Sequence, residues 1–287
     1  MRFGFADAWM CLWSIVVMPL IVHKACLQWM NERAPFRPAR QNPSSCSILS
    51  QLDLHHDDTQ CRYRRSGRMV LMTRSEALMW ARFVAGGKSP PARRRRYLEW
   101  GMGGTTEAAA LLASHGSLHI TSVDSSSQFA TVLQSTSVPI QQAVQAGWLS
   151  LHVVDVGKTA KWGFPANWSN RSTQDRHAIG TAYATAGGVL HVSGQSKQRH
   201  AGKDELYDVV FVDGRWRLAC ALHARRLLRP NGTLIVHDYT RYRKQLVEWY
   251  YPWQLEGRLA VLKPRNWKAP HRIEERPDLT AGDGAAG

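Results

Sequence analysis

The stretch RRRRYLEWGMGGTTEAAALL, residues 93–112, changes character twice. A short apolar run contains an acidic residue, three glycines then occupy four positions, and a string of helix formers follows. This order predicts a strand, a tight turn and a helix. Glycines at such a turn let the backbone approach a ligand that a side chain would exclude. The stretch therefore predicts a ligand at residues 101–104.

The alternation of strands and helices continues to residue 264. Strands are predicted at 118–124, 149–156, 207–214, 232–239 and 257–264, and helices at 127–134, 140–147, 216–228 and 243–251. A helix at 73–87 begins with a capping box, Thr73 and Glu76, and ends at two glycines. Apolar strands alternating with helices indicate a single α/β domain with a doubly wound, mostly parallel sheet. Such sheets bind ligands beyond the carboxyl ends of their strands, where the strand order reverses.

Acidic residues stand at the ends of five predicted strands. They are Glu99, Asp124, Asp155, Asp213 and Asp238. Because parallel strands end at the same edge of a sheet, we expect all five carboxylates at that edge. A single acid there is commonplace, but packing does not explain five in chain order.

Two classes of cofactor use a glycine turn between a strand and a helix. A dinucleotide site follows G-x-G-x-x-G, which Gly101 and Gly103 begin, but the sixth position is Thr106. The carboxylate of Glu99 repels a phosphate and suits a cation such as an amino group. Asp124 lies 23 residues after Gly101, where a carboxylate takes the hydroxyls of a ribose. An acid for an ammonium group, glycines for close approach and an acid for a ribose together indicate S-adenosylmethionine.

The chain also resembles a known family. YLEWGMGGTT, ITSVDSSSQF, LHVVDVG, YDVVFVDGRWRLACAL and LLRPNGTLIVHDY are similar, in this order, to motifs of class I S-adenosylmethionine-dependent methyltransferases, most of all a poorly characterised branch. The resemblance covers about residues 69–265 and implies a Rossmann-like methyltransferase fold. It implies that the methionine portion of the cofactor is lined by Glu99, Gly101, Gly103 and Gly104. It also implies that Asp124 holds the ribose and that Asp155 lies by the adenine amino group. The chain has no NPPY or DPPY motif of the kind that enzymes methylating amino groups on nucleic acid or glutamine often carry.

Methyl transfer from a sulfonium requires an oriented acceptor and, for a hydroxyl acceptor, removal of a proton. The candidate catalytic residues are Asp213, His237 and Asp238, because they project from the expected edge of the sheet. His237 beside an acid is a candidate general base, although a histidine packed into the core gives the same pattern.

Two alternatives for these strand ends remain open. Asp213 and Asp238 are placed to share a divalent cation, as in metal-dependent O-methyltransferases of this class. The residues after Asp213, Gly214 and Arg215, depart from the pattern of those enzymes, so no metal is assigned. Arg215 and Arg217 are instead an alternative clamp for an anionic acceptor.

The leading interpretation is O-methylation of a small-molecule or glycan-like acceptor. A non-catalytic S-adenosylmethionine-binding protein of the same fold is the alternative, and Thr106 and Glu99 disfavour a NAD(P)-dependent oxidoreductase. The net charge of +15 implies affinity for anions. Nucleic acid is not an expected partner, because the basic clusters lack an aromatic-interleaved RNA motif and zinc-finger spacing. The sequence does not indicate an oligomeric state.

Residues 1–25 are hydrophobic and are expected to form a signal-anchor, with a cleaved signal peptide or a transit segment as alternatives. We expect an irregular linker at 26–68, the methyltransferase-like domain at 69–265 with an insertion at 156–206, and a disordered tail at 266–287. Basic residues after the apolar run favour a cytosolic domain, whereas N-x-[ST] sequons at Asn167, Asn170 and Asn231 favour a lumenal one. We expect a single-pass membrane protein of the ER or Golgi with a lumenal domain, or alternatively an organelle-targeted soluble protein.

Overall fold

The computed structural model describes residues 54–57, 60–63, 69–70, 72–86, 93–113, 118–160, 163–190 and 206–265. The chain divides into two units, Met1–Asn42 and Pro43–Gly287, and every described residue belongs to the second. The expected signal-anchor, much of the expected linker and the expected tail therefore lie outside the described residues. Within the described ranges, no helix is long and apolar enough to cross a membrane.

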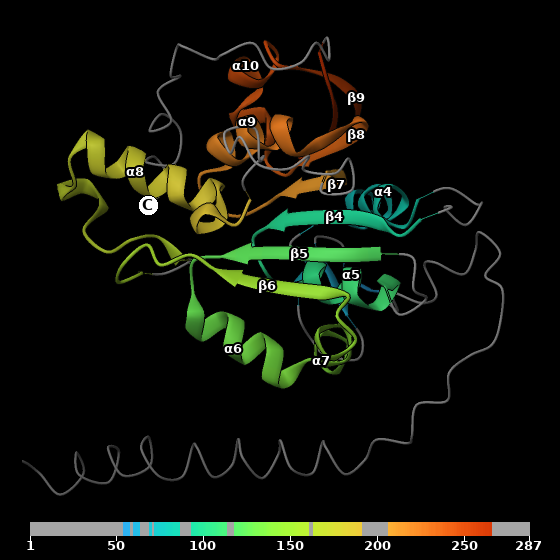
Figure 1. The fold of residues 1–287 in the computed structure, drawn as a ribbon. Coiled ribbons are helices and arrows are strands. Elements are labelled where there is room, and N and C mark those ends of the chain that lie inside the picture. Colours follow the sequence, from blue (N-terminus) through green and yellow to red (C-terminus); the bar gives the residue numbers. More distant parts are fainter. Residues whose placement is uncertain are drawn as a thin grey trace, which may run out of the picture. The chain divides into compact units, whose positions relative to one another are not determined.

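A seven-stranded sheet forms the centre of the fold (Figure 1). Its strands, in the order in which they lie, are β6 (Leu149–Val153), β5 (Leu118–Asp124), β4 (Arg95–Trp100), β7 (Tyr207–Val212), β8 (Leu228–Val236), β10 (Leu259–Pro264) and β9 (Tyr250–Glu256). The first five are mutually parallel, and β10 runs antiparallel to both of its neighbours. The chain order reverses between β4 and β7, which places the switch point at the turn that follows β4.

Helices cover both faces of this sheet and enclose two hydrophobic cores. One core contains residues of α4 (Arg74–Ala85), α5 (Gly104–Ala113), α6 (Ser127–Thr136) and α7 (Val138–Gln145). The other contains residues of α8 (Thr173–Ala184), α9 (Arg217–Leu227) and α10 (Arg243–Leu246). Figure 1 shows α6 and α7 on one side of β5 and β6, with α8 and α9 on the other. Tyr97 and Leu98, consecutive in β4, belong to opposite cores, so the strand is buried on both faces as the sequence predicts.

The structure differs from the sequence prediction at residues 243–256. The expected helix at 243–251 is limited to α10, and β9 follows it and forms a hairpin with β10. Pro252 cannot continue a helix and disfavours helical backbone in the residue before it. The aromatic residues Tyr250, Tyr251 and Trp253 favour a strand, and Gly257, at φ 54°, lies in the turn that closes the hairpin.

Two strands occur in the segment expected to be an irregular linker, β1 (Leu54–Asp57) and β2 (Gln60–Tyr63). Together with β3 (Met69–Val70), at the start of the expected domain, they form a separate three-stranded antiparallel sheet. Strands of two to four residues are too short to show a clear two-residue period in the sequence. The described part of the expected insertion is also regular: it contains η3 (Trp168–Asn170), α8 and η4 (Ala186–Gly188).

Candidate active site

The glycine turn after β4 packs against the turn after β7. Gly101 has φ 103°, and a Cβ atom there would lie 2.7 Å from the backbone nitrogen of Gly214. The Asp213 N–H also donates to the carbonyl of Trp100 at 3.0 Å. A Cβ on Gly103, in contrast, would meet no atom of the described residues within 4 Å. Gly101 is therefore required by the chain itself, whereas Gly103 borders open space at the switch point, as a ligand-binding turn must.

Three successive N–H groups of this turn donate to acceptors within the protein. The Gly101 N–H donates to the carbonyl of Val123 at 2.8 Å. The Met102 N–H donates to Oδ2 of Asp124 at 3.0 Å, and the Gly103 N–H donates to Oγ1 of Thr106 at 2.8 Å. A pyrophosphate site needs such groups free to bind phosphate oxygens. The turn consequently lacks the free donors that a dinucleotide requires at these three positions.

Glu99 lies beneath the turn and is completely buried. Oε1 accepts hydrogen bonds from the hydroxyls of Thr106 and of Ser122, the latter at 2.7 Å, while Oε2 accepts one from Tyr97 at 2.9 Å. Burial raises the pKa of Glu99 to about 7, against the opposing effect of these hydroxyl donors. The sequence prediction gave this carboxylate to a cofactor amino group, but in the structure its hydrogen bonds go to the protein.

Thr106 connects Glu99 to the turn and was not identified from the sequence as a site residue. Its hydroxyl donates to Glu99 and accepts the Gly103 N–H. The position counted against a dinucleotide motif in the sequence because it is not glycine. In the structure, the Thr106 hydroxyl fixes the turn because it links the Gly103 N–H to the buried carboxylate of Glu99 by two hydrogen bonds. Gly104 is buried as the first residue of α5.

Asp124 lies at the rim of the sheet beside the turn. Besides the Met102 N–H, its carboxylate accepts the N–H groups of Ser125 at 2.7 Å and Ser126 at 3.0 Å, both through Oδ1. Burial raises the pKa of Asp124 although these three donors act to lower it. Asp155, beyond β6, is exposed, and its Oδ1 accepts the Gly157 N–H at 2.8 Å. Both acids lie at the carboxyl ends of their strands, as predicted.

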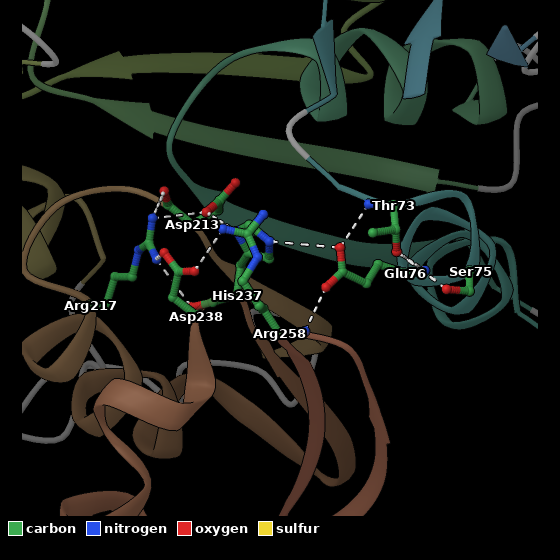
Figure 2. A network of polar contacts seen from close by, with 8 residues as sticks. All are labelled: Thr73, Ser75, Glu76, Asp213, Arg217, His237, Asp238 and Arg258. Atoms are coloured by element: carbon green, nitrogen blue, oxygen red, sulfur yellow. Dashed lines mark hydrogen bonds and ion pairs between the residues drawn. The ribbon is translucent and has the colours of Figure 1, made fainter. Parts of the chain in front are cut away.

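The three candidate catalytic residues lie in one polar network (Figure 2). Nδ1 of His237 lies 2.9 Å from Oδ1 of Asp213, and the same oxygen is 3.0 Å from Nη2 of Arg217. Nη1 of Arg217 pairs with Oδ2 of Asp238. The Asp213 side chain is 21% exposed, and within the described ranges its Oδ2 has no hydrogen-bond partner. Among the described residues, Asp213 thus has one oxygen held by His237 and Arg217 and a second oxygen without a hydrogen bond.

His237 is buried, with a side chain that is 3% exposed. Its Nε2 has no hydrogen-bond partner among the described residues and lies 4.0 Å from Oε2 of Glu76. Glu76 forms the predicted capping box with Thr73 and also accepts the Arg258 N–H at 2.6 Å. The sequence identified Glu76 only as a helix cap, because a contact between α4 and the end of β8 leaves no local signal. His237 therefore faces the protein interior rather than an acceptor.

An aromatic cluster of Phe164, Trp168, Tyr183 and Trp216 joins the insertion to the start of α9. The ring of Trp216, which is 2% exposed, lies 4.9 Å from that of Tyr183 and 6.2 Å from that of Phe164. The guanidinium of Arg215 lies over Phe164 at 5.4 Å. Ser125, next to Asp124, donates a hydrogen bond to the carbonyl of Gly163 at 3.0 Å. The insertion therefore covers both strand ends that flank the glycine turn.

Asp213 and Asp238, the alternative metal ligands of the sequence prediction, are engaged by the protein. Within the described ranges, no group of three His, Cys, Asp or Glu residues is arranged to hold a metal ion. Asp213 and Asp238 both pair with Arg217. Arg217 thus pairs with both of these acids. The sequence prediction had offered Arg217 as an alternative clamp for an anionic acceptor, and the two acids as alternative metal ligands.

The comparisons with known proteins found matches among solved structures. Neither a family model nor a curated protein matches the chain. A methyltransferase-like protein from Silicibacter pomeroyi is 26% identical over 69% of this chain and 90% of its own, with a TM-score of 0.47. A methyltransferase from Geobacter sulfurreducens in complex with S-adenosyl-L-homocysteine is 15% identical over 57% of this chain and 45% of its own, with a TM-score of 0.30.

Human methyltransferase-like protein 13, also solved with S-adenosylhomocysteine, is 13% identical over 64% of this chain and 75% of its own, with a TM-score of 0.32. All three are methyltransferases or methyltransferase-like proteins. The observed strand order, with parallel β4–β8 and an antiparallel β10, gives this chain the Rossmann-like fold of class I methyltransferases that its motifs predict.

Proposed function

We propose that this chain is an S-adenosylmethionine-dependent methyltransferase that acts on an oxygen atom of a small-molecule or glycan-like acceptor. The observation on which the proposal depends is the turn after β4. Gly103 borders open space at the switch point, and Asp124 holds the neighbouring Met102 N–H. A nucleoside cofactor without phosphates fits a turn whose N–H groups are already bonded within the protein.

The acids at the rim supply acceptors for the cofactor's donors. Among the described residues, Asp124 Oδ2 accepts only the Met102 N–H, and it keeps capacity for a ribose hydroxyl. Asp155 is exposed, and one of its oxygens is available for an exocyclic amino group. Gly101, Gly103 and Gly104 allow the chain to approach the methionine portion. Glu99 acts from beneath, through Thr106, as a positioning residue for the turn.

The proposed chemistry is an in-line displacement at a methyl carbon. When bound, the cofactor supplies a methyl group on a positively charged sulfur, and the acceptor oxygen forms the new bond to carbon as the bond to sulfur breaks. Asp213 Oδ2 takes the proton of the acceptor hydroxyl, because it is the free oxygen of a partly exposed carboxylate. His237 and Arg217 fix the other oxygen, which orients Asp213 for this role. His237 is thus a positioning residue rather than the base.

Calorimetric titration of the full chain with S-adenosylmethionine, S-adenosylhomocysteine and NAD tests the assignment. We expect the first two to bind and NAD to give no heat, since the N–H groups of Gly101, Met102 and Gly103 are bonded within the protein. Binding of NAD alone would replace the proposal with an oxidoreductase. Binding of S-adenosylmethionine without transfer of a labelled methyl group to any fraction of a cell extract would favour the non-catalytic binding protein.

We also propose that the domain resides in the secretory lumen, attached through the N-terminal apolar segment. That segment lies outside the described residues, so the support comes from the sequons. The side chains of Asn167, Asn170 and Asn231 are all exposed, as carriers of a glycan must be.

A further inference from the structure

Arg217, the first residue of α9, lies among five oxygen atoms at the ends of β7 and β8. Its Nε donates to the carbonyl of Gly214 at 3.0 Å. Nη1 donates to the carbonyl of His237 at 3.2 Å and to Oδ2 of Asp238. Nη2 donates to the carbonyl of Asp213 at 3.1 Å and pairs with Oδ1 of the same residue at 3.0 Å. We call these five oxygens the oxygen cage.

The oxygen cage surrounds the guanidinium of Arg217. Arginine carries five N–H groups in a fixed plane, and Arg217 donates four hydrogen bonds to oxygens of the cage and forms an ion pair with the fifth oxygen. The guanidinium is therefore already engaged by the protein, which disfavours Arg217 as a clamp on an anionic acceptor.

The charge of Arg217 is matched by the two acids around it. Burial disfavours the charged guanidinium, but Asp213 and Asp238 reverse this and raise the pKa of Arg217. Burial likewise disfavours the Asp238 carboxylate, and Arg217 overcomes this and lowers the pKa of Asp238. The Arg217 side chain is only 15% exposed and that of Asp238 13%. A cation is therefore a structural requirement at this position.

The ligand types of the oxygen cage are those that bind hard divalent cations. Two carboxylate oxygens and three backbone carbonyls from two strand ends resemble the donor sets of Ca²⁺ and Mg²⁺ sites in proteins. We propose that Arg217 is the resident cation of this cage, so that a side chain fills the place of a divalent metal. This inference rests on the proposed function. It predicts that methyl transfer by the chain does not depend on added metal and that Arg217 is the residue that positions Asp213.

Arg217→Ala tests the cage directly. Removing the guanidinium leaves the five oxygens of the cage without the cation that lies among them. Asp238 keeps an ion pair with Arg258 through Oδ1, but its Oδ2, the oxygen of the cage, loses its partner. This variant should therefore acquire a site for Mn²⁺. Titration of the full chain with MnCl₂, followed by the loss of the free Mn²⁺ signal in electron paramagnetic resonance, measures it. We expect the variant to bind Mn²⁺ at least about 10-fold more tightly than the wild type. A folded variant that binds Mn²⁺ no better than the wild type would overturn the proposal.

Two controls separate the cage from general effects of charge. Arg226→Ala removes an exposed arginine from the same helix and should leave Mn²⁺ binding unchanged. Asp238→Asn in the Arg217→Ala background should abolish the new site. If Arg217→Ala does not fold, the wild-type protein is titrated with Mn²⁺ instead. If the wild type binds Mn²⁺ and Asp238→Asn abolishes that binding, the proposal that Arg217 occupies the cage is contradicted. If neither the wild type nor a folded Arg217→Lys variant binds Mn²⁺, the proposal is supported.

The readout needs neither the cofactor nor an acceptor, so its outcome is independent of the proposed function. A second measurement connects the oxygen cage to methyl transfer. Guanidinium chloride, at concentrations below those that unfold the protein, should restore part of the methyl transfer that Arg217→Ala loses, whereas urea at the same concentrations should not. Loss of wild-type methyl transfer on addition of EDTA, with S-adenosylmethionine binding retained, would overturn metal independence while leaving the methyltransferase assignment intact.

Discussion

The Met102 N–H and the Asp124 carboxylate are hydrogen-bonded at 3.0 Å, which connects the glycine turn to the end of the adjacent strand. The residue expected to hold the ribose is thus also a residue that shapes the turn. Asp124 accepts two further backbone N–H groups, from Ser125 and Ser126. Its substitution should consequently affect both the cofactor and the fold.

Asp124→Ala should abolish binding of S-adenosylmethionine and also lower the free energy of unfolding. Three backbone donors lose their acceptor, and a partly buried donor left unpaired costs about 1–3 kcal/mol. Calorimetry measures the first effect and urea denaturation the second. Asp155→Ala is the matched control, because Asp155 is exposed and bonds only the Gly157 N–H: it should leave stability unchanged and weaken binding only modestly. Undiminished cofactor affinity in Asp124→Ala would remove Asp124 from the site.

Alanine substitutions at Gly101 and Gly103 should have opposite consequences. Gly101→Ala puts a Cβ against the backbone of Gly214 at a positive φ, so we expect a loss of about 2–4 kcal/mol of stability. Gly103→Ala places a Cβ within 4 Å of no atom in the part of the chain that the structure describes. The variant should therefore melt like the wild type, yet weaken S-adenosylmethionine binding about 10-fold or more by occupying the cofactor's space. A Gly103→Ala protein with wild-type affinity would show that the cofactor does not lie on this turn.

Glu99 predicts a specific dependence of stability on pH. Its pKa is raised from 4.5 to about 7 by burial. The folded protein therefore retains a proton that the unfolded chain releases near its ordinary pKa. The contribution is fully present below the unfolded pKa and is lost as pH rises to about 7, which amounts to about 3 kcal/mol.

Glu99→Gln should flatten this dependence between pH 4.5 and 7. Urea denaturation across that range measures the free energy of unfolding for both proteins. Glu248→Gln, at an exposed position, is the control and should follow the wild type. Parallel curves for wild type and Glu99→Gln would mean that Glu99 titrates in the folded protein as it does in the unfolded chain.

The main sheet could be predicted from the sequence because its strands are long, apolar and followed by acids. β4, β5 and β7, with the helices α5 and α9, lie close to the predicted ranges. The strand β9, which forms a hairpin with β10, was missed because a run of aromatic residues is compatible with either a helix or a strand. Pro252 is the residue that argues against a helix. β1–β3 were missed because very short strands leave almost no periodic signal.

The sequence predicted where the candidate site residues lie in the fold but not which groups they contact. Strand ends and a glycine turn place Glu99, Asp124 and Asp213 at one edge. Which carboxylate oxygen is free depends on partners far away in the sequence. Thr106, Ser122 and Tyr97 donate to Glu99, and α4 contributes Glu76 behind His237. Only the three-dimensional arrangement distinguishes a base from a positioning residue.

Asp213→Asn should eliminate methyl transfer while retaining the cofactor. The substitution removes the free carboxylate oxygen that is proposed to take the acceptor's proton, and it leaves the glycine turn and Asp124 intact. Transfer of a labelled methyl group to a cell extract measures activity, and calorimetry measures S-adenosylmethionine affinity. His237→Asn should lower activity less and shift its pH profile, since His237 only orients Asp213. Asp213→Asn with full activity would exclude Asp213 as the base.

The exposed sequons test the proposed lumenal location. A chain that enters the secretory pathway should carry glycans at Asn167, Asn170 or Asn231, whose side chains all reach the surface. Expression of the full chain in cultured human cells, followed by glycosidase digestion and gel electrophoresis, should give a downward shift in apparent mass. Asn231→Gln should abolish one step of the shift, whereas Asn266→Gln, outside any sequon, should abolish none. A full-length chain with no glycosidase-sensitive shift would indicate that the domain faces the cytosol or another compartment without glycosylation, as the basic residues after the apolar segment favour.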